Sequence, residues 1–247
     1  NLLNQNRIVG VGDIFKYNYN LNAEVISGYS QSQFKYNKID FYVAGSVTNT
    51  SYQREGIFEN GSFPGIESLG KGKKMNFLGF GAKTGATYKI SGKHVFDVNL
   101  GYISKAPSVQ NTYSNSRENQ NVVPNISEEK ISSIDASYIF RSSIVKAKHT
   151  GYYTQIKDAN EISFFFADGI GAINAFTENG FNEEANFVQE ILQGIQKKHF
   201  GTELGVEAQV TTTIKLKGAL AMGQFTYDNN PDLYLSSEDF TNVYLGK

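Results

Sequence analysis

The side chains that could do chemistry are few and widely spaced in this chain of 247 residues. The three histidines, His94, His149 and His199, stand in neither a metal-binding nor a catalytic-triad spacing. Cysteine is absent, which excludes disulfides, thiolate zinc sites and cysteine nucleophiles. We therefore expect no catalytic residue, no metal site, no cofactor and no enzymatic activity.

The charged residues narrow the range of partners. There are 23 basic and 24 acidic residues, so no excess positive charge is available for a phosphate backbone, and we expect no nucleic-acid partner. No glycine-rich segment follows a strand and opens a helix, as nucleotide-binding fingerprints require. The acids near the C-terminus do not follow the spacing of a calcium loop: Asp228, Asp232, Glu238 and Asp239.

Aromatic and polar residues in the expected loops are the remaining candidates for ligand binding. Three consecutive phenylalanines occur in "EISFFFADG", and exposing all three rings to water would cost free energy. Aromatic rings with a few Asn and Arg groups suit a flat or sugar-like solute, whereas packing of loop against loop would also explain the rings. The candidates are Phe58, Phe63, Tyr113, Arg117, Asn119, Phe164, Phe165, Phe166 and Phe181.

Alternation of apolar and polar residues predicts the elements that must position these loops. Fifteen Tyr and 18 Phe against only 4 Pro favour strands over helices. Period-2 runs such as 39–54 and 75–90 bring the predicted total to about eight long strands. Only the stretch at about 183–196 could be helical, and its apolar spacing is poor.

Short and long connections alternate strictly along the chain. In an antiparallel meander every second connection lies at the same end, so all tight turns should fall on one rim and all long loops on the other. This asymmetry is typical of outer-membrane β-barrels. The tight turns are Asn37-Lys38, Ser91-Gly92-Lys93, Ser142-Ser143 and Thr211-Thr212-Thr213, and the long loops are 55–74, 106–127 and 158–189.

The barrel interpretation also predicts which side chains face lipid. Charged residues should keep to the opposite parity, because a lysine facing lipid at the midplane costs roughly 2 to 4 kcal/mol. His149 falls on the lipid side, which requires either a β-bulge or a neutral ring. Aromatic residues near the tight turns would form an interfacial girdle, or reflect the usual strand preference: Phe34, Tyr36, Phe41, Tyr42, Tyr88, Phe96, Tyr138 and Phe140.

About eight crossings would bring the chain back to the long-loop side, whereas bacterial barrels have both termini at the short-turn rim. We therefore expect an all-β, antiparallel up-and-down transmembrane β-barrel, of which residues 1–247 form a middle segment of about eight strands. The plug domain and the C-terminal strands of the whole barrel would be absent from this chain. A closed eight-stranded barrel is the alternative architecture.

Two stretches resemble a known family. Ser104-Lys105-Ala106-Pro107, a polar loop, and Val123-Pro124-Asn125-Ile126 before Glu128-Glu129 resemble the barrel signature of TonB-dependent outer-membrane receptors. "FGTELGVEAQVTTTIKLKGAL" is similar to a strand, short turn and strand of the same family. The wealth of Asn, Tyr and Lys is similar to receptors of Bacteroidetes.

The resemblance implies a function in the Gram-negative cell outer membrane. Extracellular loops would capture a scarce solute, a siderophore, glycan or peptide, and TonB would drive its import through a plug. Outer-membrane lipid and a surface lipoprotein lid would be further partners. The alternatives are a small closed barrel that serves as structural anchor or adhesin, and a secreted glycan-binding β-sandwich.

Overall fold

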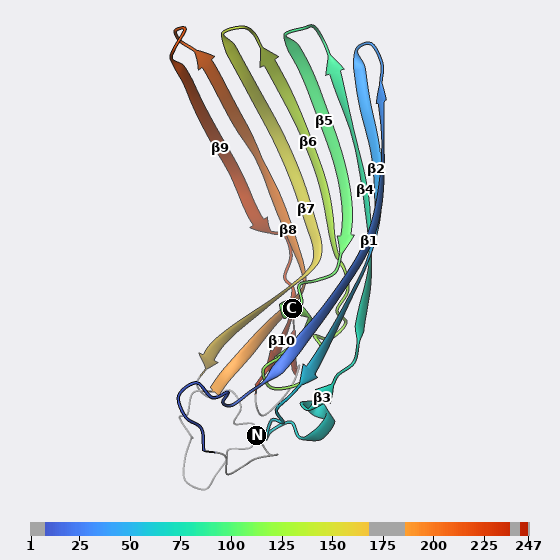
Figure 1. The fold of residues 1–247 in the computed structure, drawn as a ribbon, viewed down its shortest axis with the longest axis vertical. Coiled ribbons are helices and arrows are strands. Elements are labelled where there is room, and N and C mark those ends of the chain that lie inside the picture. Colours follow the sequence, from blue (N-terminus) through green and yellow to red (C-terminus); the bar gives the residue numbers. More distant parts are fainter. Residues whose placement is uncertain (1–7, 168–185, 238–242, 247) are drawn as a thin grey trace.

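A computed structural model describes residues 8–167, 186–237 and 243–246 of the chain. These residues form one antiparallel sheet of 11 strands in the order β1-β2-β4-β5-β6-β7-β8-β10-β11, with β3 paired to β2 and β9 paired to β8 (Figure 1). The described residues contain two helical turns of three residues each, η2 (Gly65–Glu67) and η3 (Gln110–Thr112). No helix among them is long and apolar enough to cross a bilayer.

Eight long strands and three short ones make up the sheet. The bounds are β1 (Tyr19–Lys35), β2 (Ile39–Gly56), β3 (Gly70–Lys71), β4 (Met75–Lys89), β5 (His94–Lys105), β6 (Glu129–Arg141), β7 (Val145–Ala167), β8 (Asn186–Gln209), β9 (Lys215–Tyr227), β10 (Asp232–Ser236) and β11 (Val243–Gly246). The tight turns lie together at the top of Figure 1, and the long connections lie at the other end. The expected separation of turn rim and long-loop rim is therefore confirmed.

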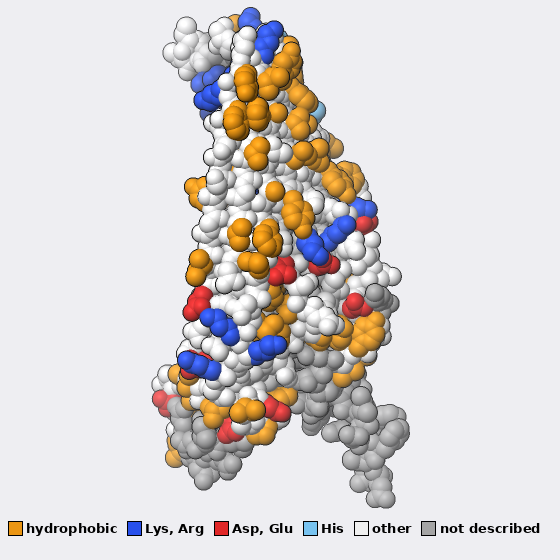
Figure 2. Space-filling view, turned by 90° about the vertical axis from the view of Figure 1, so that its right-hand side faces the viewer, with side chains coloured by type: hydrophobic (Ala, Val, Ile, Leu, Met, Phe, Trp, Pro, Cys, Tyr) orange, Lys and Arg blue, Asp and Glu red, His pale blue; other side chains and the backbone are white. Residues whose placement is uncertain are grey.

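The register gives the sheet an apolar face. One row across β5 to β8 joins Leu100, Ile134, Tyr153 and Phe200, which are 38% to 47% exposed. Below the top rim, hydrophobic side chains dominate the upper part of Figure 2, and acidic side chains appear only from the middle downward. A large exposed apolar surface of this kind is unusual in water and expected in lipid.

The opposite, polar face carries the charges. The amide of Asn99 donates to Asp97 Oδ2 at 2.8 Å and to Asp135 Oδ1 at 3.0 Å, and it accepts from the hydroxyl of Tyr42 at 3.2 Å. Glu207 forms ion pairs with three lysines on neighbouring strands, Lys146 on β7 and Lys215 and Lys217 on β9. On the turn side of the sheet, the expected segregation of charge by parity is therefore confirmed.

Two details of the predicted faces are now decided. His149 lies on the apolar face, where its Nε2 is 2.7 Å from Thr202 Oγ1, and the pairing of β7 with β8 is regular around it. The β-bulge proposed at this position is therefore wrong. Tyr42 points to the polar face, so it cannot belong to an aromatic girdle, whereas Phe34 and Phe41 stack at 4.8 Å near the turn rim.

The β7–β8 hairpin differs from the prediction. Phe164, Phe165 and Phe166 lie in β7 and not in a loop. Of the stretch at 183–196 that could be helical, residues 186–196 lie in β8, and residues 183–185 lie outside the described residues. Within the long loop expected at 158–189, residues 158–167 and 186–189 are strand, and residues 168–185 lie outside the described residues. Two register shifts interrupt the alternation of apolar and polar residues at 157–160. This polar run therefore resembles a turn in the sequence, although it lies within a strand.

These register shifts form a kink that crosses three neighbouring segments. They are residues 157–160 of β7, residues 194–196 of β8, and residues 228–231, which connect β9 to β10. Asp158 has a φ of 57° and Gly194 a φ of 70°. The side chain of Asn229 bridges the kink, since its Oδ1 accepts from Gln196 N at 2.8 Å and its Nδ2 donates to Gly194 O at 2.9 Å. Beyond the kink the hairpin changes direction in Figure 1.

The sheet is open among the described residues. β1 and β9 each pair with one neighbour only, along β2 and β8. The closed eight-stranded barrel is therefore not the observed architecture. A two-sheet sandwich is also wrong, because the described strands belong to one sheet.

Candidate ligand-binding site at the long-loop rim

The loop between β5 and β6 packs onto the polar face of β2 and β4. Tyr113 joins Tyr52 and Phe77 in a buried cluster, with the Tyr52 and Phe77 ring centroids 5.8 Å apart. The Tyr52 hydroxyl donates to Pro107 O at 3.0 Å. Burial raises the pKa of the Tyr113 phenol, and its hydroxyl has no hydrogen-bond partner within the described ranges. Tyr113 is therefore covered by protein.

Arg54 of β2 ties two loops to the sheet, although only 1% of it is exposed. Its Nε donates to Ser116 O and its Nη1 to Ser68 O, both at 2.7 Å. Its guanidinium lies 5.2 Å from the centre of the Tyr19 ring. Desolvation lowers the pKa of Arg54, since carbonyl oxygens and a ring surround it in place of water.

The same two loops also bond directly to each other. Gln120 Nε2 donates to Leu69 O at 3.1 Å and to Gly70 O at 3.0 Å, and Gln120 N donates to Glu67 O at 2.9 Å. Asn119 is 1% exposed, and its Oδ1 accepts from Asn121 N at 2.9 Å. Phe63 is 9% exposed. Asn119 and Phe63 thus lie inside the loop assembly that Arg54 holds.

A cavity of about 310 Å³ opens beside this assembly. It brings together the N-terminal segment, both loops and the ends of β7 and β8. Two of the residues expected to bind a ligand, Arg117 and Phe166, line it. The full lining is Lys16, Tyr17, Asn60, Asn115, Arg117, Glu118, Phe166 and Phe187.

The cavity combines cations with aromatic walls. Lys16 and Arg117 are cationic and Glu118 is the acid among its lining residues. The Arg117 guanidinium lies 5.5 Å from the centre of the Tyr17 ring, and the Phe166 and Phe187 rings are 5.2 Å apart. Ammonium and guanidinium groups only donate hydrogen bonds, so the cavity suits a solute rich in acceptors that also has an apolar surface.

The remaining candidates lie around this cavity or outside the described residues. Phe164 is 50% exposed and stacks on Phe187 at 5.6 Å, while Phe165 is half-buried. Phe58 is half-buried, and its backbone N–H donates to Asn18 O at 3.0 Å. Phe181 lies outside the described residues. Binding by these side chains stays a prediction.

Sequence reasoning missed most of the cavity lining. Phe187 pairs with Phe166 in the β7–β8 register, a signal that becomes visible only when 158–167 is taken as strand. Lys16 has a φ of 71°, which places it in a turn that sequence alone did not indicate. Asn60 and Asn115 each accept a nearby backbone N–H, as loop asparagines commonly do.

The histidines do not form a metal centre within the described ranges. His94 lies at the turn rim with its Nδ1 2.5 Å from the Tyr138 hydroxyl, and His199 meets Phe225 edge-on at 4.9 Å. No group of three or more His, Cys, Asp or Glu side chains gathers among the described residues.

Comparison with known proteins gives a fold and no sequence family. No family model and no curated protein matches the chain. A solved structure named "Copper transporter OprC" is similar, with a TM-score of 0.60 and 13% identity, over 87% of this chain and 32% of the other. The chain thus spans about a third of that neighbour. This all-β antiparallel sheet, open in the described residues, has an outer-membrane barrel-like fold.

Proposed function

We propose that this chain is part of an outer-membrane transport receptor that captures a solute at the long-loop rim. The observation that carries the proposal is the donor-rich, aromatic cavity at that rim. It stands at one end of a sheet whose turn-side half exposes an apolar face suited to lipid. The similarity of the fold to that of a transporter also supports this proposal.

The solute is an anionic, acceptor-rich molecule with an apolar surface. Lys16 and Arg117 repel bare metal cations and attract carboxylates, phosphates or sulfates. Phe164, which stacks on Phe187, and Phe166, which is tilted against Phe187, offer contact area for a flat or sugar-like part. Among siderophores, glycans and peptides, this favours the acidic members of each class.

Import is driven by TonB through a plug supplied outside this chain, as the resemblance to TonB-dependent receptors implies. The motif Ser104-Lys105-Ala106-Pro107 ends β5 and starts the loop that packs onto the rim, the position it has in that family. The unpaired edges of β1 and β9 leave backbone groups for further strands of a larger barrel. A surface lipoprotein lid and a Bacteroidetes origin belong to the same proposal.

The experiment separates charge from shape. The detergent-solubilised protein is passed over immobilised acidic glycans, carboxylate chelates and acidic peptides, each beside an uncharged counterpart. We expect retention of an acidic member and a loss of about tenfold or more in affinity for Arg117→Gln, because a hydrogen bond to a charged group contributes about 1.5 to 3 kcal/mol. Lys93→Gln at the turn rim is the control. Equal retention of charged and uncharged sets would contradict the proposal.

A further inference from the structure

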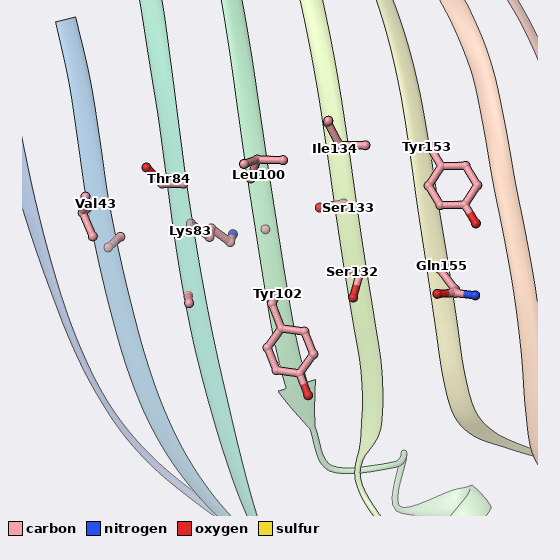
Figure 3. Close-up of a pocket in the computed structure, with 13 residues that line it drawn as sticks. Val43, Lys83, Thr84, Leu100, Tyr102, Ser132, Ser133, Ile134, Tyr153 and Gln155 are labelled. Carbon is pink, nitrogen blue, oxygen red and sulfur yellow. The ribbon is translucent and has the colours of Figure 1, made fainter.

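The apolar face carries a groove that is separate from the long-loop cavity. It has a volume of about 580 Å³ and is lined mainly by apolar-face side chains of β2, β4, β5, β6 and β7. Figure 3 shows Tyr102 of β5 and Tyr153 of β7 on either side of β6, which carries Ser132 and Ile134 between them. The short Ser132 side chain leaves room that the two tyrosine rings border.

The groove reaches the level where a membrane would end. Tyr102 and Tyr153 each lie about ten residues from a tight turn, and a tilted strand crosses hydrocarbon in about 9 to 11 residues. Tyrosine is enriched at that boundary because its ring is apolar and its hydroxyl is polar. The part of the groove toward the turns therefore faces acyl chains, and its tyrosine end faces headgroups.

Lysines stand directly beyond that boundary. On the apolar face, the next cross-strand pair after Ser132 and Gln155 is Lys130 and Lys157. Lys198 occupies the corresponding part of β8. These are the first charged side chains on this face of β6, β7 and β8 when each strand is followed from its tight turn through the described residues.

Lys157 differs from its two neighbours in lacking a partner. Lys130 pairs with Asp158 at 2.7 Å, and Lys198 pairs with Asp228 at 2.6 Å. The nearby Glu128 carboxylate accepts a hydrogen bond from the backbone N–H of Leu78 at 3.0 Å, and its charge attracts the Lys130 ammonium. Lys157 is exposed and forms no ion pair with any part of the chain that the structure describes.

A lysine directly opposite another lysine is destabilising, so an anion bound between them would reduce their repulsion. We propose that the groove and Lys157 bind one phospholipid, with an acyl chain in the groove and the headgroup phosphate on the Lys157 ammonium. The Tyr102 and Tyr153 hydroxyls and the Gln155 amide stand where the ester oxygens would lie. The site rests on the proposal that the apolar face contacts lipid.

The test compares two lipids with the same acyl chains, one with a phosphoglycerol headgroup and one without it. Native mass spectrometry of the full chain in detergent is used to titrate dioleoylphosphatidylglycerol and dioleoylglycerol. We expect one phosphatidylglycerol retained per chain and about tenfold weaker retention by Lys157→Gln, while Lys148→Gln, on the polar face of the same strand, is unchanged. Ser132→Trp, which fills the groove, should weaken retention with Lys157 intact.

Equal retention of the two lipids, or unchanged retention by both Lys157→Gln and Ser132→Trp, would overturn the site. Flotation of the protein with vesicles, measured separately, reports whether the apolar face enters lipid at all. If the protein does not float with vesicles, the proposal that the apolar face contacts lipid is wrong. If it floats but retains both lipids equally, only the phospholipid site is wrong. The exposed side chain of Lys157 forms no ion pair within the described ranges, so its replacement should leave the strands paired.

Discussion

The turn-side and long-loop halves of the sheet bury their side chains in opposite ways. The most buried apolar residues, among them Phe77, Val123 and Ile191, all lie on the long-loop side, and so do the buried Arg54 and Asn119. The turn-side half exposes most of its large hydrophobic residues on one face, whereas Tyr29 is exposed on the other. The long-loop half is thus held together as a small globular protein is, by its own packing, whereas the turn-side half depends on what surrounds it.

The same contrast appears in the backbone. On the turn side of the kink, β8 and β9 pair without a shift over all 13 residues of β9, from Lys215 to Tyr227. On the long-loop side, β7 and β8 shift register twice, and single side chains such as Asn229 and Arg54 hold the result. Regular strand pairing determines the backbone of the turn-side half, and individual hydrogen bonds of side chains determine the backbone of the long-loop half.

The largest expected effect comes from removing Arg54. Arg54→Ala leaves the buried carbonyls of Ser68 and Ser116 without donors, at about 1 to 3 kcal/mol each. Limited proteolysis should cut the loops at 57–69 and 106–128 much faster, while the turn-side strands stay protected. Arg141→Ala, at the turn rim, is the matched control. A uniform loss of protection over both halves would contradict the division drawn here.

A charge on the apolar face probes the other half. Val98→Lys should cost roughly 2 to 4 kcal/mol in folding into vesicles, because Val98 lies on the apolar face midway between the tight turn and Tyr102, where a lysine would be near the midplane. Asn99→Lys, one residue away on the polar face, should cost far less. The measurement is the urea midpoint of each variant in lipid. Equal midpoints would mean that the two faces meet the same solvent.

The two halves also differ in how much of their structure could be predicted from the sequence. Alternation around Leu100 and Ile134 is a repeated signal, so strands, faces and rims could be predicted. The kink could not, because Lys157 to Asn160 has the composition of a turn and only the pairing across three strands makes it a bulge. Nothing local marks Arg54 as a clamp, since its partners are backbone carbonyls 14 and 62 residues away. The cavity joins five segments of the chain, so its lining depends on how these segments assemble.

Asn229 tests whether the kink is held by one side chain. Asn229→Ala removes two hydrogen bonds to backbone groups of β8, for which about 1 to 3 kcal/mol is expected. Hydrogen exchange of the Gln196 amide should accelerate by about tenfold or more. Asn230→Ala, its exposed neighbour, should leave that exchange rate unchanged. An unchanged rate in both variants would show that strand pairing alone sets the bend.

The smallest effect expected is the pH dependence of the kink. Burial would raise the pKa of Glu161, but hydrogen bonds from Lys197 and from the Tyr227 hydroxyl, the latter at 2.9 Å, lower it below the ordinary 4.5. A carboxylate with a depressed folded-state pKa stabilises the fold above its unfolded pKa, and the contribution disappears as pH falls through the folded one. The contribution should stay within about 1 kcal/mol, because the pair is partly exposed and salt screens it.

Glu161→Gln separates this pair from every other titrating group. At neutral pH the variant should exchange amide hydrogens near the kink slightly faster than the native chain. The two rates, corrected for intrinsic exchange, should converge below pH 4.5, where the native Glu161 loses its charge. A difference that persists unchanged at low pH would assign the effect to the shape of the side chain. Because the Lys197–Glu161 ion pair spans the kink, convergence would also show that electrostatics helps to join the two halves of the sheet.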